Sequence, residues 1–188
     1  MDVKSLFYRT PLVHAPYVEI VYDDCALHST KLRTEGLKEH DATDATPPAH
    51  VHQCLAWFED FFCGHYHPID WKLLCPRWSC RCFARHVYET LSTIPAGDVI
   101  TYGELARRCG SPNAARAIGQ LMNHNPFHLI VPCHRVISKS GSPLLFVLGP
   151  DVKRELLCRE GIKLDDPHRF QSQNRVSFCG HTPNSKTL

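Results

Sequence analysis

Residues 101–122 have the sequence TYGELARRCGSPNAARAIGQLM, which predicts two short helices joined by a tight turn. Thr101 with Glu104 three residues later is the pattern of a capping box, so the first helix is expected to begin there. Ser111, followed by a proline, is the expected N-cap of the second helix, which ends before Asn125. Two short helices joined in this way form the pattern of a helix-turn-helix, whose second helix can enter a groove of DNA.

The segments on either side of this pair indicate a mixed α/β chain. Residues 17–22 are β-branched or aromatic and predict a strand. Apolar residues recur at helical spacing in three further segments, which are expected to be helices: 51–64, 83–94 and 151–160. Residues 33–50 are polar and aperiodic, which is typical of a long surface loop.

The domain boundary is expected where the pattern is interrupted by prolines. Residues 65–77 carry two prolines and no period, which suits a crossover. We therefore predict an N-terminal α/β domain over 1–76 and an α-rich C-terminal domain over 77–164. Residues 165–188 are polar and are expected to form a tail without regular structure.

Composition excludes several classes of protein. The chain has 188 residues, is 43% hydrophobic and has no apolar run long enough for a membrane span. Ten cysteines without a secretory signal favour reduced thiols in the cytosol or nucleus over a disulfide scaffold. The net charge is only +2, so a nucleic-acid partner would have to bind a local basic patch.

The sequence IVPCHRV at residues 130–136 is the best candidate for reactive chemistry. A cysteine reacts as its thiolate, and an adjacent base or cation brings the thiol pKa into the working range. Cys133 is followed directly by His134 and Arg135. The alternative is a buried cysteine beside a hydrogen-bonded histidine, because cysteine is among the most buried residue types.

The charge of the same region favours a phosphate-bearing partner. Between residues 102 and 139 a single acid, Glu104, stands against five basic residues. These are Arg107, Arg108, Arg116, Arg135 and Lys139. A near-neutral chain has thus placed a basic face on the helix pair and beside the candidate nucleophile, where phosphates could be held.

These motifs together resemble a known family. The sequence PCHRV at 132–136, with Asn125-Pro126 and AARAIG at 114–119, is similar to O6-alkylguanine-DNA alkyltransferases. The resemblance implies a ribonuclease H-like N-terminal sheet and a C-terminal winged helix-turn-helix domain. It also implies DNA repair by irreversible, stoichiometric transfer of a guanine O6-alkyl group to the protein's own cysteine. A monomeric nuclear protein that acts on double-stranded DNA without a cofactor or membrane is expected.

The resemblance also implies roles for individual residues. Cys133 takes the place of the alkyl acceptor, and His134 that of the base that removes its proton through a water. Glu160 matches the glutamate that orients this histidine, and Asn125 matches the asparagine that fixes the cysteine turn. Tyr102 and Arg116 correspond to the pair that rotates the target nucleotide out of the duplex.

Further residues match family positions at the DNA backbone or depart from the family pattern. The expected DNA contacts include Gly103, Ser111, Arg135 and Lys139. In the loop 144–149, Phe146 keeps an apolar wall, but Val147 replaces a residue that often donates a hydrogen bond to the base. We expect this change to affect the rate and lesion preference.

A structural zinc is not expected. Cys25, His28 and Cys75 match or lie near ligand positions of zinc-binding family members, whereas Ser5 replaces the remaining cysteine. A closed zinc site normally has four protein ligands, and this chain offers three.

Two other functions remain open at this level. One is a DNA-binding module that recognises alkylguanine with weak or no transfer, which the altered 144–149 loop makes plausible. The other is an unrelated thiol-dependent hydrolase. The retained Cys133 argues against the first, and the basic helix pair argues against the second.

Overall fold

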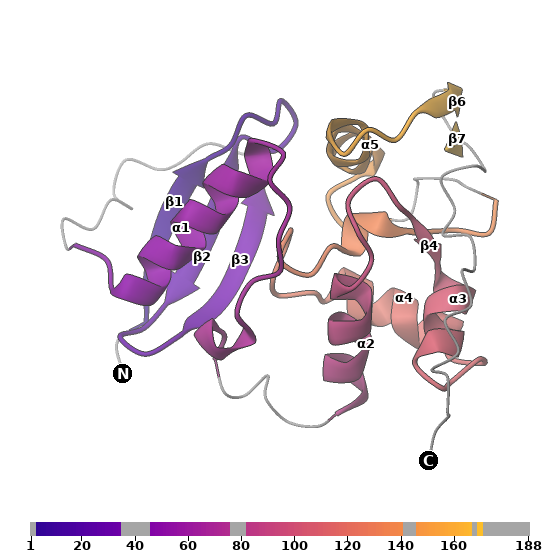
Figure 1. The fold of residues 1–188 in the computed structure, drawn as a ribbon, viewed down its shortest axis with the longest axis horizontal. Helices are drawn as coiled ribbons and strands as arrows, with labels where there is room; N and C mark the ends of the chain where they lie inside the picture. Colours follow the sequence, from indigo (N-terminus) through magenta and orange to yellow (C-terminus); the bar gives the residue numbers. More distant parts are fainter. Residues whose placement is uncertain (1–2, 35–45, 76–81, 141–145, 167–168, 171–188) are drawn as a thin grey trace, which may run out of the picture.

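In the computed structural model the chain forms an α/β unit followed by a mainly helical one (Figure 1). The structure describes residues 3–34, 46–75, 82–140, 146–166 and 169–170. The N-terminal unit is an antiparallel sheet in the order β1-β2-β3, with strands Lys4–Arg9, Tyr17–Tyr22 and Leu27–Arg33. The predicted strand 17–22 is confirmed as the central one, and its Val18 and Ile20 side chains are fully buried.

Helix α1 (Ala49–Phe62) lies across one face of this sheet (Figure 1). Its buried side chains include Val51, Cys54 and Phe58, whose spacing is the helical period predicted from the sequence. The helix gives way to Gly64, which adopts φ 86°, a conformation open to glycine at little steric cost.

The C-terminal unit consists of short helices and two-residue strands. In chain order these elements are α2 (Phe83–Ser92), β4 (Ile100–Thr101), α3 (Tyr102–Arg108), α4 (Ala115–Asn123), η3 (Cys133–Arg135), β5 (Val136–Ile137) and α5 (Pro150–Arg159). Strands β4 and β5 pair in parallel. Helices α2 and α5 confirm the helices predicted at 83–94 and 151–160, and their ends differ from the prediction by no more than two residues.

The start of α3 is confirmed and the start of α4 is corrected. The Thr101 hydroxyl accepts the Glu104 backbone N–H at 3.1 Å, as a capping residue does. Ser111 does not cap α4, because its carbonyl accepts the N–H of Ala114 in a turn and the helix begins at Ala115. The proline after Ser111 lies in this turn rather than in the first turn of the helix.

The segment after residue 164 is not wholly irregular. Strand β6 (Leu164–Asp166) pairs antiparallel with β7 (Arg169–Phe170), so the start of the expected tail is a small hairpin. Such a short ladder is held by backbone hydrogen bonds and leaves no periodic signal in the sequence. The remainder of the expected tail, 171–188, lies outside the described residues.

The two units share a hydrophobic core and are joined by the segment that leads to the cysteine turn. A single cluster of buried side chains includes Ile20 and Phe58 of the first unit and Leu105 and Ile118 of the second. The strand β3 edge bonds directly to this segment, because Thr30 N–H donates to the Pro126 carbonyl at 2.8 Å. After η1 (Trp71–Leu73), Cys75 contacts the sheet, because its N–H donates to the Leu27 carbonyl at 2.8 Å.

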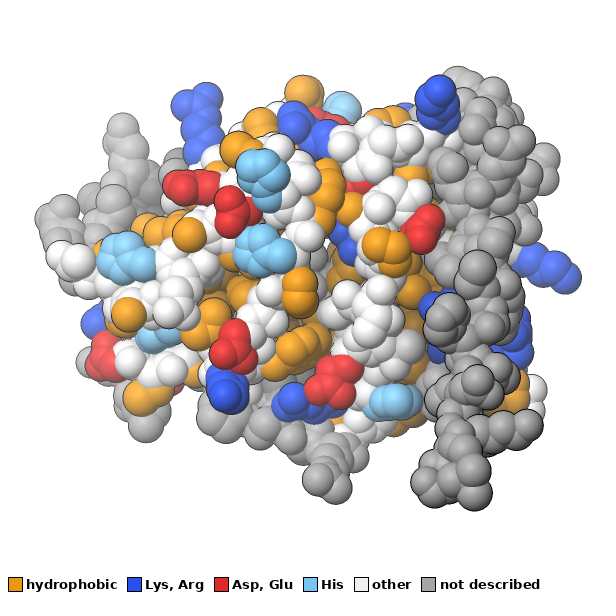
Figure 2. Space-filling view, viewed as in Figure 1, with side chains coloured by type: hydrophobic (Ala, Val, Ile, Leu, Met, Phe, Trp, Pro, Cys, Tyr) orange, Lys and Arg blue, Asp and Glu red, His pale blue; other side chains and the backbone are white. Residues whose placement is uncertain are grey.

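The surface view shows charges of both signs over the visible face and hydrophobic side chains in the hollow between the two units (Figure 2). In the described part of the chain no helix has the length and hydrophobicity needed to cross a membrane. The eight cysteines in the described ranges are all free thiols.

Candidate functional site

The cysteine turn is a buried one-turn helix. Cys133 opens η3 directly after Pro132 and is 3% exposed. Its backbone N–H donates to the Val131 carbonyl at 2.8 Å. Four residues earlier, Leu129 adopts φ 72°, a left-handed conformation that costs a non-glycine residue on the order of 1–3 kcal/mol. The surrounding contacts therefore hold the turn in a shape that the local sequence alone would not prefer.

The Asn125 side chain holds the segment that leads to Cys133 through several hydrogen bonds. Its amide Nδ2 donates to the Val131 carbonyl at 2.9 Å, and its Oδ1 accepts the Phe127 N–H at 2.9 Å. A further hydrogen bond links its side chain to the Cys133 thiol. Asn125 is 2% exposed, so these bonds form without competition from bulk water. The residue thus connects the end of α4 to the thiol.

His134, Arg135 and Glu160 form a buried charged cluster beside the cysteine. His134 Nε2 donates to Glu160 Oε1 at 2.9 Å, and a carboxylate only accepts, so Nδ1 is the basic nitrogen of the neutral ring. Arg135 donates from Nη2 to Glu160 Oε1 at 2.7 Å and from Nε to Oε2 at 3.0 Å. The Phe61 ring of α1 meets the His134 ring edge-on at 6.5 Å, so the N-terminal unit also supports the histidine.

Burial and ion pairing act in opposite directions on the pKa values here. Burial raises the pKa of the Cys133 thiol, although Asn125 and the positive charge of Lys153 oppose that shift. Burial also lowers the pKa of His134 against the opposing effect of Glu160. For Glu160, burial alone would raise the pKa, but His134 and Arg135 outweigh it and hold the pKa at about 2. At neutral pH the site therefore holds a thiol, a neutral imidazole and a carboxylate.

Lys153 is a functional candidate that sequence reasoning missed. It lies on α5, is fully buried, and donates from Nζ to the Val136 carbonyl at 2.6 Å. Burial lowers its pKa to about 8, and the nearby Cys133 opposes that shift. A lysine on a helix is expected to be exposed to solvent, because lysine is almost never fully buried. Only the packing of Lys153 against the cysteine turn shows that it belongs to the site.

Tyr102 and Arg116 line one pocket at the helix pair. This pocket has a volume of about 670 Å³, and its walls also include Asn123, Phe146 and Val147. Tyr102 is half-buried at the start of α3, and Arg116 is exposed in the first turn of α4. The structure therefore places Tyr102 and Arg116, which the family resemblance assigns to a common role, in the walls of one pocket.

The altered loop closes one side of the same pocket. Phe146 packs against the core and lies 5.7 Å from Lys153 Nζ, measured to its ring centroid. Val147 is 50% exposed on the pocket wall and offers no side-chain donor. Leu144 and Leu145 lie outside the described residues.

The expected basic face is smaller than the sequence suggests. Arg135 is 7% exposed and bound to Glu160 and to the Ile94 carbonyl at 2.6 Å, so it is not placed for a phosphate contact. Arg107 and Arg108 both pair with Glu104. Their charges are thereby partly neutralised.

The remaining predicted DNA-contact residues are spread over the C-terminal unit. Gly103 is exposed on α3, Ser111 is half-buried in the turn before α4, and Lys139 is exposed after β5. None of the three lines the pocket that contains Tyr102 and Arg116. Their assignment to the DNA backbone stays a prediction.

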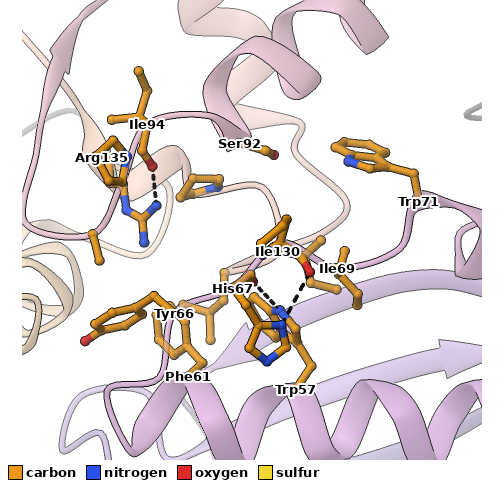
Figure 3. Close-up of a pocket in the computed structure, with 15 residues that line it drawn as sticks. Trp57, Phe61, Tyr66, His67, Ile69, Trp71, Ser92, Ile94, Ile130 and Arg135 are labelled. Atoms are coloured by element: carbon orange, nitrogen blue, oxygen red, sulfur yellow. Dashed lines mark hydrogen bonds between the residues drawn. The ribbon is translucent and has the colours of Figure 1, made fainter.

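A second pocket lies between the two units, behind the cysteine turn (Figure 3). It has a volume of about 320 Å³ and is walled by Trp57 and Phe61 from α1 and by Ile130 and Arg135 from the C-terminal unit. The bond from Arg135 to the Ile94 carbonyl closes one end. Cys133 is not part of its lining, and it is not part of the lining of the Tyr102–Arg116 pocket either.

The residues considered for zinc do not assemble a site. His28 Nε2 lies 2.8 Å from Asp23 Oδ2, and the other oxygen of Asp23 accepts the backbone N–H groups of Cys25 and Ala26. Within the described ranges no group of three or more His, Cys, Asp or Glu side chains is arranged to hold a metal ion.

A buried thiol with a histidine backed by a carboxylate is the arrangement of an activated cysteine nucleophile. The helical unit that carries it, residues 82–162, matches the family model of the 6-O-methylguanine DNA methyltransferase DNA-binding domain. The methylated-DNA–protein-cysteine methyltransferase of Homo sapiens is 34% identical over 181 residues, which cover 89% of this chain and 86% of that protein. The protein of the same name from Shigella flexneri is 38% identical over 132 residues, covering 70% of this chain and 72% of its own.

A solved structure extends the likeness to the fold. The crystal structure of Mycobacterium tuberculosis OGT in complex with DNA superposes with a TM-score of 0.66 at 28% identity, covering 86% of this chain and 93% of that one. The chain therefore belongs to the family of methylated-DNA–protein-cysteine methyltransferases.

Proposed function

We propose that this protein repairs alkylated DNA by transferring the O6-alkyl group of guanine to Cys133. The observation that carries the proposal is the buried Cys133 beside the His134–Glu160 pair, on the unit that matches the family's DNA-binding domain. In the reaction the sulfur–carbon bond forms as the carbon–O6 bond breaks. The thiol proton passes to the guanine, which is restored to the normal base and stays in the DNA strand. The thioether is stable, so each molecule acts once.

The charged cluster supplies the base. His134 Nδ1 takes the thiol proton through a water, and the Glu160 carboxylate stabilises the imidazolium that forms. Arg135 keeps Glu160 ionised and in place, which makes Arg135 a positioning residue rather than a DNA contact. Asn125 fixes the turn, and the Lys153 ammonium favours the developing thiolate.

The DNA is handled by the helix pair. A stacked guanine does not expose O6 to an in-line attack, so the nucleotide has to rotate out of the duplex. The pocket of Tyr102 and Arg116 is the place where Tyr102 presses on the target phosphate and Arg116 fills the gap in the stack. Gly103, Ser111 and Lys139 are proposed backbone contacts.

The finer description of the fold and setting belongs to the same proposal. The antiparallel β1-β2-β3 sheet with α1 supports a ribonuclease H-like N-terminal unit. The packed α3–α4 pair with the β4–β5 ladder supports a winged helix-turn-helix unit. A monomer acting on double-stranded DNA in the nucleus, without a cofactor, stays a prediction.

The decisive experiment is mass spectrometry after mixing with duplex DNA that carries one O6-methylguanine. A mass increase of one methyl group, mapped to Cys133, is the expected result. DNA binding without an adduct would favour the recognition module, for which the donor-less Val147 is the one supporting feature. Thiol-dependent hydrolysis without DNA would favour the hydrolase.

Arg116→Ala should slow transfer on duplex DNA at least about tenfold, the equivalent of ~1.4 kcal/mol of barrier. Transfer from a free alkylated guanine base should change much less, because a free base needs no rotation. Both rates are measured by the appearance of alkylated protein. Arg9→Ala, which removes an exposed arginine of β1, is the control and should leave both rates unchanged. Equal losses on the two substrates would assign Arg116 to the fold.

A further inference from the structure

Helix α5 is hydrogen-bonded to the loop that joins β1 to β2 in the N-terminal unit, and it lies beside the end of the sheet that carries this loop (Figure 1). Glu155 of α5 accepts the Val13 N–H at 2.7 Å through Oε1 and the His14 N–H at 3.1 Å through Oε2. One helical turn later, Arg159 donates from Nη2 to the Pro11 carbonyl at 2.8 Å. We call these three hydrogen bonds the α5 clamp.

The loop, residues 10–16, is held in shape by its own contacts. The Thr10 hydroxyl donates to the Ala15 carbonyl at 2.7 Å and accepts the Leu12 N–H at 3.1 Å. The Leu12 and Ala15 side chains are buried in the core that the two units share. Because the loop is fixed from within, it presents its two backbone donors to Glu155 in a set geometry.

Glu155 lies between the two residues through which α5 contributes to the site. Lys153, two residues earlier, donates from Nζ to the Val136 carbonyl at 2.6 Å, directly after the cysteine turn. Glu160, five residues later, caps the helix and accepts from His134 at 2.9 Å. All three residues belong to one short helix and its cap, so a shift of α5 at Glu155 moves the ammonium and the carboxylate of the site together.

The apolar packing of α5 is too small to fix its position by itself. Its buried apolar side chains are Val152, Leu156 and Leu157, and the remaining buried side chain is Lys153. Apolar burial is non-directional, whereas hydrogen bonds from fixed donors to a carboxylate are short and directional. The Glu155 side chain is only 16% exposed, so water competes little for its oxygens. The α5 clamp is therefore the contact that defines where α5 lies along its own axis.

We propose that Glu155 is a positioning residue for alkyl transfer, because its hydrogen bonds to the β1–β2 loop set the places of Lys153 and Glu160 relative to Cys133. The inference rests on the proposed function and adds to it a residue that lines neither of the two pockets described above. A misplacement of about 1 Å at a reacting group slows a reaction by up to about 100-fold, so a small shift of α5 is enough to be measured as a slower transfer.

The test uses three variants of the contact and one matched control, all in the full chain. Glu155→Ala removes both acceptors, and Glu155→Gln keeps one acceptor oxygen at nearly the same side-chain size. Thr10→Val removes the hydroxyl that shapes the loop. Asp151→Asn neutralises an exposed carboxylate of the same helix and is the control. For each protein we would measure the maximal single-turnover rate at saturating O6-methylguanine duplex, the Kd for that duplex and the melting temperature.

Glu155→Ala should lower the maximal rate about tenfold, and Glu155→Gln about threefold because it keeps one of the two hydrogen bonds. The Kd for DNA should stay that of the parent, because Glu155 does not line the Tyr102–Arg116 pocket. Thr10→Val should slow transfer as well, and should add no further loss in the Glu155→Ala background, because both changes act on one contact. The control should keep the parent rate. Each rate is measured well below the melting temperature of its variant, so that a loss of stability alone does not lower it.

Each of the opposite results would overturn the inference. A parent-like maximal rate in Glu155→Ala, even with a lower melting temperature, would show that apolar packing alone positions α5. Equal losses in Glu155→Gln, Glu155→Ala and Asp151→Asn would assign the effect to the charge of the helix. Losses of Thr10→Val and Glu155→Ala that multiply would show that the loop and Glu155 act independently. Absence of transfer by the parent would remove the proposed function itself, and with it the reaction that Glu155 serves.

Discussion

Cys133→Ser is expected to abolish alkyl transfer while leaving duplex DNA binding within about twofold of the parent. A serine hydroxyl is far harder to deprotonate than a thiol, and burial already raises the pKa of the Cys133 thiol. His134 cannot supply a base strong enough for the hydroxyl, so the reaction stops. The measurement is protein mass after incubation with O6-methylguanine duplex, together with a gel-shift titration of the same DNA.

The exposed cysteines provide the matched control. Cys63 and Cys158 are solvent-accessible, and Cys158 lies on α5 only two residues before Glu160. Their serine variants should take up one methyl group at the parent rate. A methyl adduct on either of these residues, or full transfer to the Cys133→Ser protein, would show that the buried thiol is not the acceptor.

Glu160→Gln should give the largest loss of stability among the site variants. Glu160 is the shared acceptor of Arg135 and His134, and removing one partner of a buried ion pair costs about 3–5 kcal/mol. In a chain of this size the melting temperature should fall by on the order of 10 °C. The transfer rate, measured well below the new melting temperature, should fall about 100-fold because the imidazolium loses its counter-charge.

The pH dependence checks the same assignment. The pKa of folded Glu160 is about 2, below its ordinary value of 4.5, so its ionised form stabilises the fold above the ordinary pKa. That contribution is lost as the pH falls toward about 2. The stability difference between parent and Glu160→Gln should therefore be greatest near neutral pH and shrink below about pH 4.5.

A surface pair on the same helix is the control for Glu160→Gln. Asp151 and Arg154 form an exposed i,i+3 pair on α5, and such pairs contribute less than about 1 kcal/mol. Asp151→Asn should change neither the melting temperature nor the rate appreciably. A similar loss in both variants would mean that α5, rather than the buried cluster, is the sensitive element.

Local sequence was sufficient for the features that depend on neighbouring residues. The threonine cap of α3, the helical faces of α1 and α2, and the glycine after α5 follow from side chains a few residues apart. The strand at 17–22 follows from its β-branched and aromatic composition. The outer strands were missed because Leu27–Arg33 mixes polar residues into its buried face and Lys4–Arg9 is only half-buried.

The sequence by itself determined the position of the candidate nucleophile and of its adjacent histidine, because PCHRV is one contiguous motif. Tertiary packing alone decided the roles that depend on distant partners. Arg135 looked like a surface cation until Glu160, 25 residues away, and the Ile94 carbonyl, 41 residues away, were seen to bury it. Nothing in the local sequence distinguishes Lys153 or His128. Lys153 is defined by its hydrogen bond to the Val136 carbonyl, and His128 by its hydrogen bond with Leu32, 96 residues away. The properties of a buried polar group depend on the hydrogen-bond or ion-pair partner that offsets its desolvation. The fold, rather than the neighbouring sequence, determines which residue that partner is.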